Sequence, residues 1–227
     1  IPNGSTNRAF DCNDLGMVRT VTFVVRDGSG NEANCMVDIT TLDTVPPTFT
    51  CPADQEVALD ANCQFEVPDL ITGILFDDNC PAATIAQDPV ATTLISSADE
   101  QTSVVTITAT DAAGNTNATA CEVTLTAQDM TPPTFACPAD QEVMLDANCQ
   151  FEVPDLITGI LIDDNCPAVT IAQDPVATTL ISSADEQASV VTIIATDAAG
   201  NTNTTTCEVT LTAQDMVPPA FTCTSDH

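Results

Sequence analysis

Apolar and polar residues alternate along short segments of the chain, and turn-forming residues separate these segments. In Val104–Thr110, three apolar residues alternate with threonines, a period of two that is typical of a β-strand with one buried face. Cys121–Ala127 alternates in the same way. Asp111–Asn115 lies between the two strands and contains Gly and Asn, which tolerate positive φ, so the sequence predicts a β-hairpin here.

Shorter segments of the same character precede this hairpin. Glu56–Leu59 and Cys63–Val67 are predicted to form another hairpin around Asp60-Ala61-Asn62. Further strands are predicted at Ile71–Phe76, Thr84–Ala86 and Thr93–Ile95. No segment shows a helical period. Six or seven short strands with turns about every ten residues predict an all-β fold built from antiparallel β-sandwiches.

The whole pattern occurs twice. Residues 43–128 align with residues 129–214 without a gap and with ten differences, all between small or apolar residues. Each copy opens with a double proline, which fixes two φ angles and removes two N–H donors, so we expect a stiff, extended joint. Residues 1–42 resemble the second half of a repeat. We therefore expect a window on a longer array with these parts: 1–42, 43–128, 129–214, and the start of a further repeat at 215–227.

The net negative charge of the chain limits the classes of molecule that it could bind. Each full repeat carries 13 Asp or Glu and no Lys or Arg, and the chain has a net charge of −30. Such a surface repels itself unless bound cations or a salty medium reduce the repulsion. Nucleic acid and anionic membranes are poor partners for it. A solubilising or halophilic surface is the alternative interpretation.

Eleven regularly spaced cysteines predict disulfide bonds, and hence an extracellular or cell-surface location. Zinc binding fits less well, because the spacings within a repeat are 12, 17 and 41 residues and the only histidine is His227. No apolar run is long enough to predict insertion into a membrane.

Four motifs recur at fixed places: Asp43-x-x-Pro-Pro-x-Phe-x-Cys-Pro, Asp78-Asn-Cys, Ala109-Thr-Asp-Ala-Ala-Gly-Asn and Cys121-Glu-Val. Together they resemble the hyalin repeat family, and the resemblance covers both full repeats and both partial ends. It implies tandem immunoglobulin-like sandwiches in an extended array, in an extracellular matrix, adhesion or bacterial surface protein. The chain departs from the family pattern at Leu70–Phe76, which is longer, and at Ser96–Glu100, which replaces Phe-Pro-x-Gly.

The strand order also bears on how the cysteines pair. In a sandwich, the first strand and the last strand of a repeat would run parallel and start at the same end, which favours Cys51–Cys121 and Cys137–Cys207. The remaining cysteines would then pair as Cys63–Cys80 and Cys149–Cys166. A simple hairpin places Cys63 at the opposite end from Cys80, so a bond across the joint, Cys63–Cys137, is the alternative. Three cysteines have no partner in the window: Cys12, Cys35 and Cys223.

Acidic side chains from three places are predicted to gather beside the preceding domain: the entry Asp, the Asp-Asp-Asn loop and the hairpin turn. Oxygen ligands from several loops suit Ca²⁺, and turn capping by the same side chains is the alternative. The candidate ligands are Asp43, Asp77, Asp78, Asn79, Asp111 and Asn115, and, in the second repeat, Asp129, Asp163, Asp164, Asn165, Asp197 and Asn201. Three sequons are candidate glycosylation sites or chance matches: Asn3, Asn117 and Asn203.

The sequence contains no nucleophile–base pairing and no phosphate-binding loop, so we expect a protein that is not an enzyme. Uniform repeats predict a structural component of an extracellular filament, stalk or matrix, whose partners are other copies of itself or neighbouring repeats. The alternative is a cell-surface adhesin whose repeats present a distal ligand-binding domain.

Overall fold

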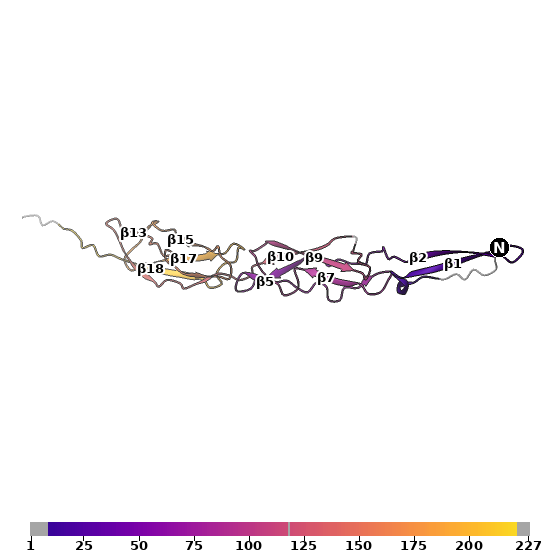
Figure 1. Cartoon of the computed structure of the whole chain (residues 1–227). Coiled ribbons are helices and arrows are strands. Elements are labelled where there is room, and N and C mark those ends of the chain that lie inside the picture. Colours follow the sequence, from indigo (N-terminus) through magenta and orange to yellow (C-terminus); the bar gives the residue numbers. More distant parts are fainter. Residues whose placement is uncertain (1–8, 118, 222–227) are drawn as a thin grey trace, which may run out of the picture. The chain divides into compact units, whose positions relative to one another are not determined.

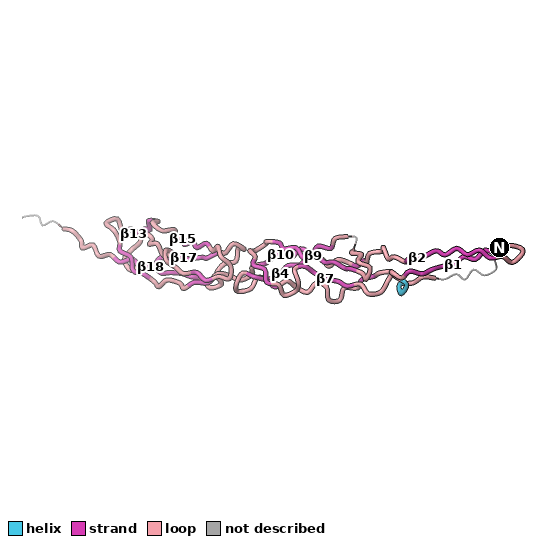
Figure 2. The backbone as a smooth tube through the Cα atoms, viewed as in Figure 1, coloured by secondary structure: helices cyan, strands magenta, loops and turns pink. Residues whose placement is uncertain are grey.

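The computed structural model describes residues 9–117 and 119–221, and their regular structure is almost entirely β (Figure 2). The one helix within these ranges is a short 3-10 helix, η1 (Cys12–Asp14), whose first turn is capped by Asp11. No helix in the described part of the chain is long and apolar enough to cross a membrane. Three residues named above fall outside the described ranges: Asn3, Cys223 and His227.

The second repeat shows the sandwich most completely. It contains eight strands: β11 (Thr134–Phe135), β12 (Gln141–Met144), β13 (Gln150–Glu152), β14 (Ile162–Asp163), β15 (Thr170–Asp174), β16 (Leu180–Ser182), β17 (Ala188–Thr196) and β18 (Cys207–Gln214). Four of them form a sheet in the order β12-β18-β17-β15, in which β17 and β18 lie side by side (Figure 1). β12 runs parallel to β18, as the strand order of a sandwich requires, and the other pairs are antiparallel. Two short ladders, β11-β14 and β13-β16, complete the repeat.

The core of the second repeat lies between the four-stranded sheet and the two ladders. Alternate residues of β17 and β18 are fully buried, among them Ile193 and Leu211. Phe151 on β13 and Leu156 after it pack against them from the opposite layer. The alternation of apolar residues with threonines therefore places one face of each long strand in the core, and the predicted β-sandwich is confirmed.

The first repeat has the same strand order. Its strands are β3 (Thr48–Phe49), β4 (Gln55–Ala58), β5 (Gln64–Glu66), β6 (Phe76–Asp77), β7 (Thr84–Asp88), β8 (Leu94–Ser96), β9 (Thr102–Thr110) and β10 (Cys121–Gln128). The N-terminal segment forms a separate hairpin of β1 (Val18–Arg26) and β2 (Glu32–Thr40), and the N–H of Asp27 donates to the carbonyl of Asn31 in the turn between them. The apolar residues of this hairpin are largely exposed, Phe23 by 54%, although the equivalent residues of the full repeats are buried.

The described chain divides into two compact units, which do not follow the repeat boundaries. One unit contains the described residues up to Gln55 together with Glu66–Thr93 and Ser103–Leu125. The other contains Glu56–Phe65, Leu94–Thr102 and the chain from Thr126 onward. Part of the first repeat therefore clusters with the whole of the second repeat. The boundaries 43–128 and 129–214 describe the sequence period, and as domain boundaries they stay a prediction.

The strand predicted at Ile71–Phe76 is wrong for most of its length. Only Phe76 enters a strand, β6. The N–H groups of Ile71 and Thr72 both donate to Asp69 Oδ1 at 3.0 Å, and this local turn replaces a ladder. Gly73 follows with a φ of +87°, a left-handed conformation that a strand does not contain.

The hairpin predicted from Glu56–Leu59 and Cys63–Val67 is also wrong as a ladder. The turn forms, because the N–H of Asp60 donates to the carbonyl of Gln64 at 2.7 Å. The flanking strands, however, separate: β4 is a neighbour of β10, and β5 is a neighbour of β8. The turn therefore carries the chain from one sheet to the other.

Truncating the core leucine on β18, Leu211→Ala, is expected to lower the free energy of unfolding by about 2–5 kcal/mol, since the fully buried side chain leaves a cavity. Leu161→Ala removes the same atoms from a residue that is 90% exposed and is the matched control. Urea unfolding followed by circular dichroism measures both. Equal stability of the two variants would contradict the assigned core.

Candidate functional site

Three carboxylates converge in each full repeat. In the second repeat they belong to Asp129, Asp164 and Asp197, and one oxygen from each lies within 4.8 Å of the other two. Asp129 opens the repeat, Asp164 follows β14, and Asp197 follows β17 directly. Asp129 and Asp197 are buried, and Asp164 is partly buried.

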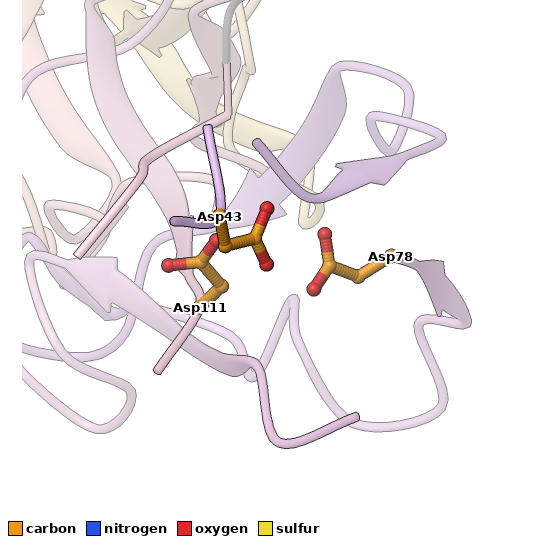
Figure 3. Close-up of side chains that lie close together, drawn as sticks. All are labelled: Asp43, Asp78 and Asp111. Carbon is orange, nitrogen blue, oxygen red and sulfur yellow. The ribbon is translucent and has the colours of Figure 1, made fainter. Parts of the chain in front are cut away.

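The first repeat contains the equivalent cluster, made by Asp43, Asp78 and Asp111. Figure 3 shows the carboxylates of Asp43 and Asp78 facing each other, with Asp111 beside Asp43. We call the two groups the carboxylate clusters. Residues from three distant parts of the sequence thus form each cluster.

An asparagine at the end of the hairpin turn holds the second cluster together. The N–H of Asn201 donates to Asp197 Oδ1 at 2.7 Å, and its side-chain Nδ2 donates to Asp197 Oδ2 at 2.9 Å. The same Nδ2 also donates to the carbonyl of Asp129 at 3.1 Å. A fourth hydrogen bond comes from the first repeat, where Asp99 Oδ1 accepts the N–H of Asp129 at 2.6 Å.

In the first repeat, Asn115 makes the same contacts with Asp111 and Asp43. Burial raises the pKa of Asp111, but the hydrogen bonds from the side chain and backbone of Asn115 outweigh burial and hold that pKa below its usual value. Asp111 therefore caps its turn as an ionised carboxylate while it takes part in the cluster. Turn capping and cation binding do not exclude each other here.

Several buried oxygens in the clusters and beside them have no hydrogen-bond donor in the described structure. They are Asp43 Oδ2, Asp78 Oδ1, both side-chain oxygens of Asp164, and Asn165 Oδ1. An unsatisfied buried acceptor costs about 1–3 kcal/mol, and more when it is charged. These oxygens are therefore placed where a cation would satisfy them.

The electrostatics of Asp164 agree with this geometry. Burial raises the pKa of Asp164, and the neighbouring carboxylates of Asp129 and Asp197 raise it further. The nearby N–H groups of Cys166 and Asn165 oppose this effect only in part, since they are not in hydrogen-bonding geometry with the carboxylate. The repeat contains no Lys or Arg that would neutralise the cluster. Three converging carboxylates fit a hard cation such as Ca²⁺.

The other candidate ligands lie beside the clusters or away from them. Asp77 and Asp163 are exposed on their short strands and are absent from both clusters, because adjacent strand residues point to opposite faces. The side-chain Nδ2 of Asn79 donates to Asp43 Oδ1 at 3.1 Å, so it orients a cluster member. Asn115 and Asn201 act in the same way.

Four disulfides are present in the described residues. Two of them are the bonds that the strand order favours, Cys51–Cys121 and Cys137–Cys207. The other half of the predicted pairing, Cys63–Cys80 with Cys149–Cys166, is wrong, and so is the alternative Cys63–Cys137. The structure instead contains Cys12–Cys80 and Cys63–Cys166, while Cys35 and Cys149 are free and exposed.

The geometry of the second repeat explains why Cys149 and Cys166 do not pair. The carbonyl of Cys149 accepts the N–H of Ser183, which precedes β17, whereas Cys166 adjoins the carboxylate cluster that follows β17. A nine-residue strand spans about 30 Å, far beyond the reach of a disulfide. The cysteine of the Asp-Asp-Asn-Cys loop therefore bonds to the preceding part of the chain.

The Cys63–Cys166 bond has a hydrogen bond beside it. The side-chain Nδ2 of Asn165 donates to the carbonyl of Asp60 at 3.2 Å. One short loop therefore supplies Asp164 to the carboxylate cluster, and Asn165 and Cys166 to the turn of the first repeat. We call the contacts of Asn165 and Cys166 with Asp60 and Cys63 the latch. Sequence reasoning missed it because the period of the chain does not reveal which ends of two repeats meet.

The asparagines of both described sequons have structural contacts. Asn117 Oδ1 accepts the N–H of Ala109 at 2.9 Å, and Asn117 Nδ2 donates to the carbonyl of Thr119 at 2.7 Å. Asn203 makes the equivalent pair of bonds with Ala195 and Thr205. Glycosylation at Asn117 and Asn203 stays a prediction, and Asn3 lies outside the described residues.

Comparison with known proteins gives one curated relative and a set of solved structures. No protein-family model matches the chain. Hyalin from Strongylocentrotus purpuratus is 29% identical over 226 residues, an alignment that covers 90% of this chain and 17% of hyalin. The chain is a relative of hyalin. This relationship and the four disulfides identify it as an extracellular repeat protein.

Solved structures similar to this chain include two cadherins and a bacterial module. Mouse cadherin-23 EC22–24 is 16% identical with a TM-score of 0.38, and the match covers 92% of this chain and 78% of that one. Drosophila N-cadherin EC1–3 is 13% identical with a TM-score of 0.33, covering 92% and 82%. The fibronectin(III)-like modules of Clostridium thermocellum CbhA are 10% identical with a TM-score of 0.27, covering 78% and 100%.

Proposed function

We propose that this chain is a non-enzymatic structural element of an extracellular filament, stalk or matrix, in which Ca²⁺ and disulfides stiffen the joints between repeats. The observation that carries the proposal is the overlap of the four disulfide loops. They span residues 12–80, 51–121, 63–166 and 137–207. Every residue from 12 to 207 therefore lies inside at least one loop that overlaps the next.

Overlapping loops shorten the covalent path along which force travels. A pull applied at Cys12 and Cys207 can cross three bonds: Cys12–Cys80, Cys63–Cys166 and Cys137–Cys207. Only the 17 residues from Cys80 back to Cys63 and the 29 from Cys166 back to Cys137 remain in the path. At about 3.5 Å per residue, the fully unfolded chain between Cys12 and Cys207 would reach about 180 Å, compared with about 680 Å without the bonds.

Calcium would act on the same joints. Asp129 belongs to the joint, Asp164 to the Asp-Asp-Asn-Cys loop and Asp197 to the hairpin turn of the second repeat. A cation bound by all three would fix the joint to the body of the repeat and satisfy the two unpaired oxygens of Asp164. The repulsion within a repeat that has 13 acidic residues and no basic ones would fall at the same time.

Single-molecule pulling from the two ends tests this proposal. We expect the segment between Cys12 and Cys207 to extend to at most about 180 Å in the oxidised chain. In the reduced chain, the same segment should extend to about 680 Å. Leu211→Ala is the control, since it weakens the fold without changing the covalent path. Release of the full length from the oxidised chain would contradict the mechanical role.

The alternative function is an adhesin stalk that presents a distal ligand-binding domain, which the relationship to hyalin also permits. Negative-stain images of the purified chain separate the two. Filaments with a repeat of roughly 35–45 Å per domain, the length of a long strand with its turns, support the structural role. Isolated strings with no lateral or end-to-end association favour the stalk.

A further inference from the structure

Cys149, one of the two free cysteines among the described residues, has the same surroundings as a bonded one. The N–H of Cys149 donates to the carbonyl of Asp146 at 3.0 Å, and that of Cys63 donates to Asp60 at 3.1 Å. Both cysteines have a φ of +56°, a sparsely populated conformation for a residue with a side chain. Cys63 is bonded to Cys166, whereas the thiol of Cys149 is exposed.

The loop cysteines of both repeats bond to the preceding part of the chain. Cys166 bonds to Cys63, and Cys80 bonds to Cys12. The N–H of Gly16 donates to the carbonyl of Thr41, as the N–H of Glu100 does to Ala127, so Cys12 corresponds to Ser96 in the first repeat. Ser96 adjoins Ser97, whose N–H donates to the carbonyl of Cys63 at 3.2 Å. Both partners therefore come from the same tip of a repeat.

Where the chain leaves the second repeat, it makes the same hydrogen bond as at the joint between the two full repeats. The N–H of Asp215 donates to Asp185 Oδ1 at 2.7 Å, as the N–H of Asp129 donates to Asp99 Oδ1 at 2.6 Å. The N–H of Val217 then donates to Asp215 Oδ1 at 2.9 Å, which matches the turn at Asp129. The chain leaves the second repeat as it leaves the first, in the geometry that brings Cys63 to Cys166.

We infer that Cys149 is the docking cysteine for a following repeat, and that it forms a disulfide with the cysteine of that repeat's Asp-Asp-Asn-Cys loop. The asparagine of the same loop would donate to the carbonyl of Asp146, as Asn165 does to Asp60. Formation of the bond removes two protons and two electrons from the two thiols. Glutathione disulfide takes up both and is cleaved to two glutathione thiols. This inference rests on the proposed function, because it continues the covalent path into the next repeat.

Counting free thiols in two chains tests the inference. One is the present 227-residue chain, and the other carries a further copy of residues 129–214 inserted after Gln214, both refolded with glutathione disulfide. In the present chain, Cys149→Ser should lower the number of free thiols by one, because Cys149 has no partner there. In the extended chain the same substitution should raise it by one, because the loop cysteine of the added repeat is released.

A decrease of one in both chains would overturn the inference, since Cys149 would then be free even beside a following repeat. A disulfide-linked dimer of the present chain that Cys149→Ser abolishes would overturn it too, because the partner would be a second copy. Cys35→Ser is the matched control and should lower the count by one in both chains. The pulling response of the present chain does not involve Cys149, so the proposed function can hold when this inference fails.

Discussion

Replacing Cys137 and Cys207 together by alanine is expected to lower the free energy of unfolding of the second repeat by about 3 to 4 kcal/mol. The bond closes a loop with a sequence separation of 70 residues, which limits the conformations of the unfolded chain. It also joins the start of the repeat to β18, whose inner face lies in the core. Since a domain is stable by about 5–15 kcal/mol, the loss is a large part of the total.

Equilibrium unfolding in urea measures this effect, and Cys149→Ala is the control because it removes a thiol that forms no bond. The control should unfold with the midpoint of the native chain. If the double variant unfolded at that midpoint as well, the Cys137–Cys207 bond would contribute nothing to stability, and the bracing role assigned to it would be wrong.

Calcium is expected to stabilise the chain, by about 2.7 kcal/mol for each occupied cluster at a free concentration 100 times the dissociation constant. The variant Asp164→Asn should lose the stabilisation of the second cluster. In the presence of a chelator, the same variant should be more stable than the native chain. Burial and the neighbouring carboxylates raise the pKa of Asp164 because both disfavour its ionised form, and a neutral amide removes that cost at neutral pH.

Thermal unfolding in Ca²⁺ and in chelator, with calorimetric titration, measures both effects. Asp163→Asn is the matched control, because it removes the same charge from the exposed neighbour of Asp164. The control should keep the calcium response. Identical responses of Asp164→Asn and Asp163→Asn would show that calcium acts through the general acidity of the surface, without a site at the cluster.

Local patterns identified the strands that carry the core. In Val104–Thr110 and Cys121–Ala127, the period of two alone indicates which face is buried, because neighbouring strand residues point to opposite sides. The structure extends these segments by one or two residues, to β9 and β10. The strand predicted at Ile71–Phe76 is wrong for a physical reason. Its apolar composition favours a strand, but Asp69 captures the following N–H groups and closes a turn.

The carboxylate clusters could be predicted only in part. The sequence indicated three acidic elements near one end of a repeat, and the structure brings one aspartate from each together. Which of two adjacent aspartates turns inward depends on the direction of a side chain on a two-residue strand, so Asp163 and Asp164 could not be separated beforehand. The sequence predicts Asn115 and Asn201 as cation ligands, whereas in the structure their side chains donate hydrogen bonds to the aspartates.

The sequence by itself determined the period of 86 residues, the β-sandwich, the presence of disulfides and the bond between the first and last strands of each full repeat. The period follows from aligning the two copies. The other features follow from spacings within one repeat, where strand direction fixes which residues are neighbours. Only the tertiary structure decided which cysteines bond to Cys63 and Cys80. It alone also shows that the buried carboxylate oxygens of Asp164 have no hydrogen-bond donor. Those depend on which end of one repeat meets the next segment of the chain, and two nearly identical repeats present the same residues at every candidate contact.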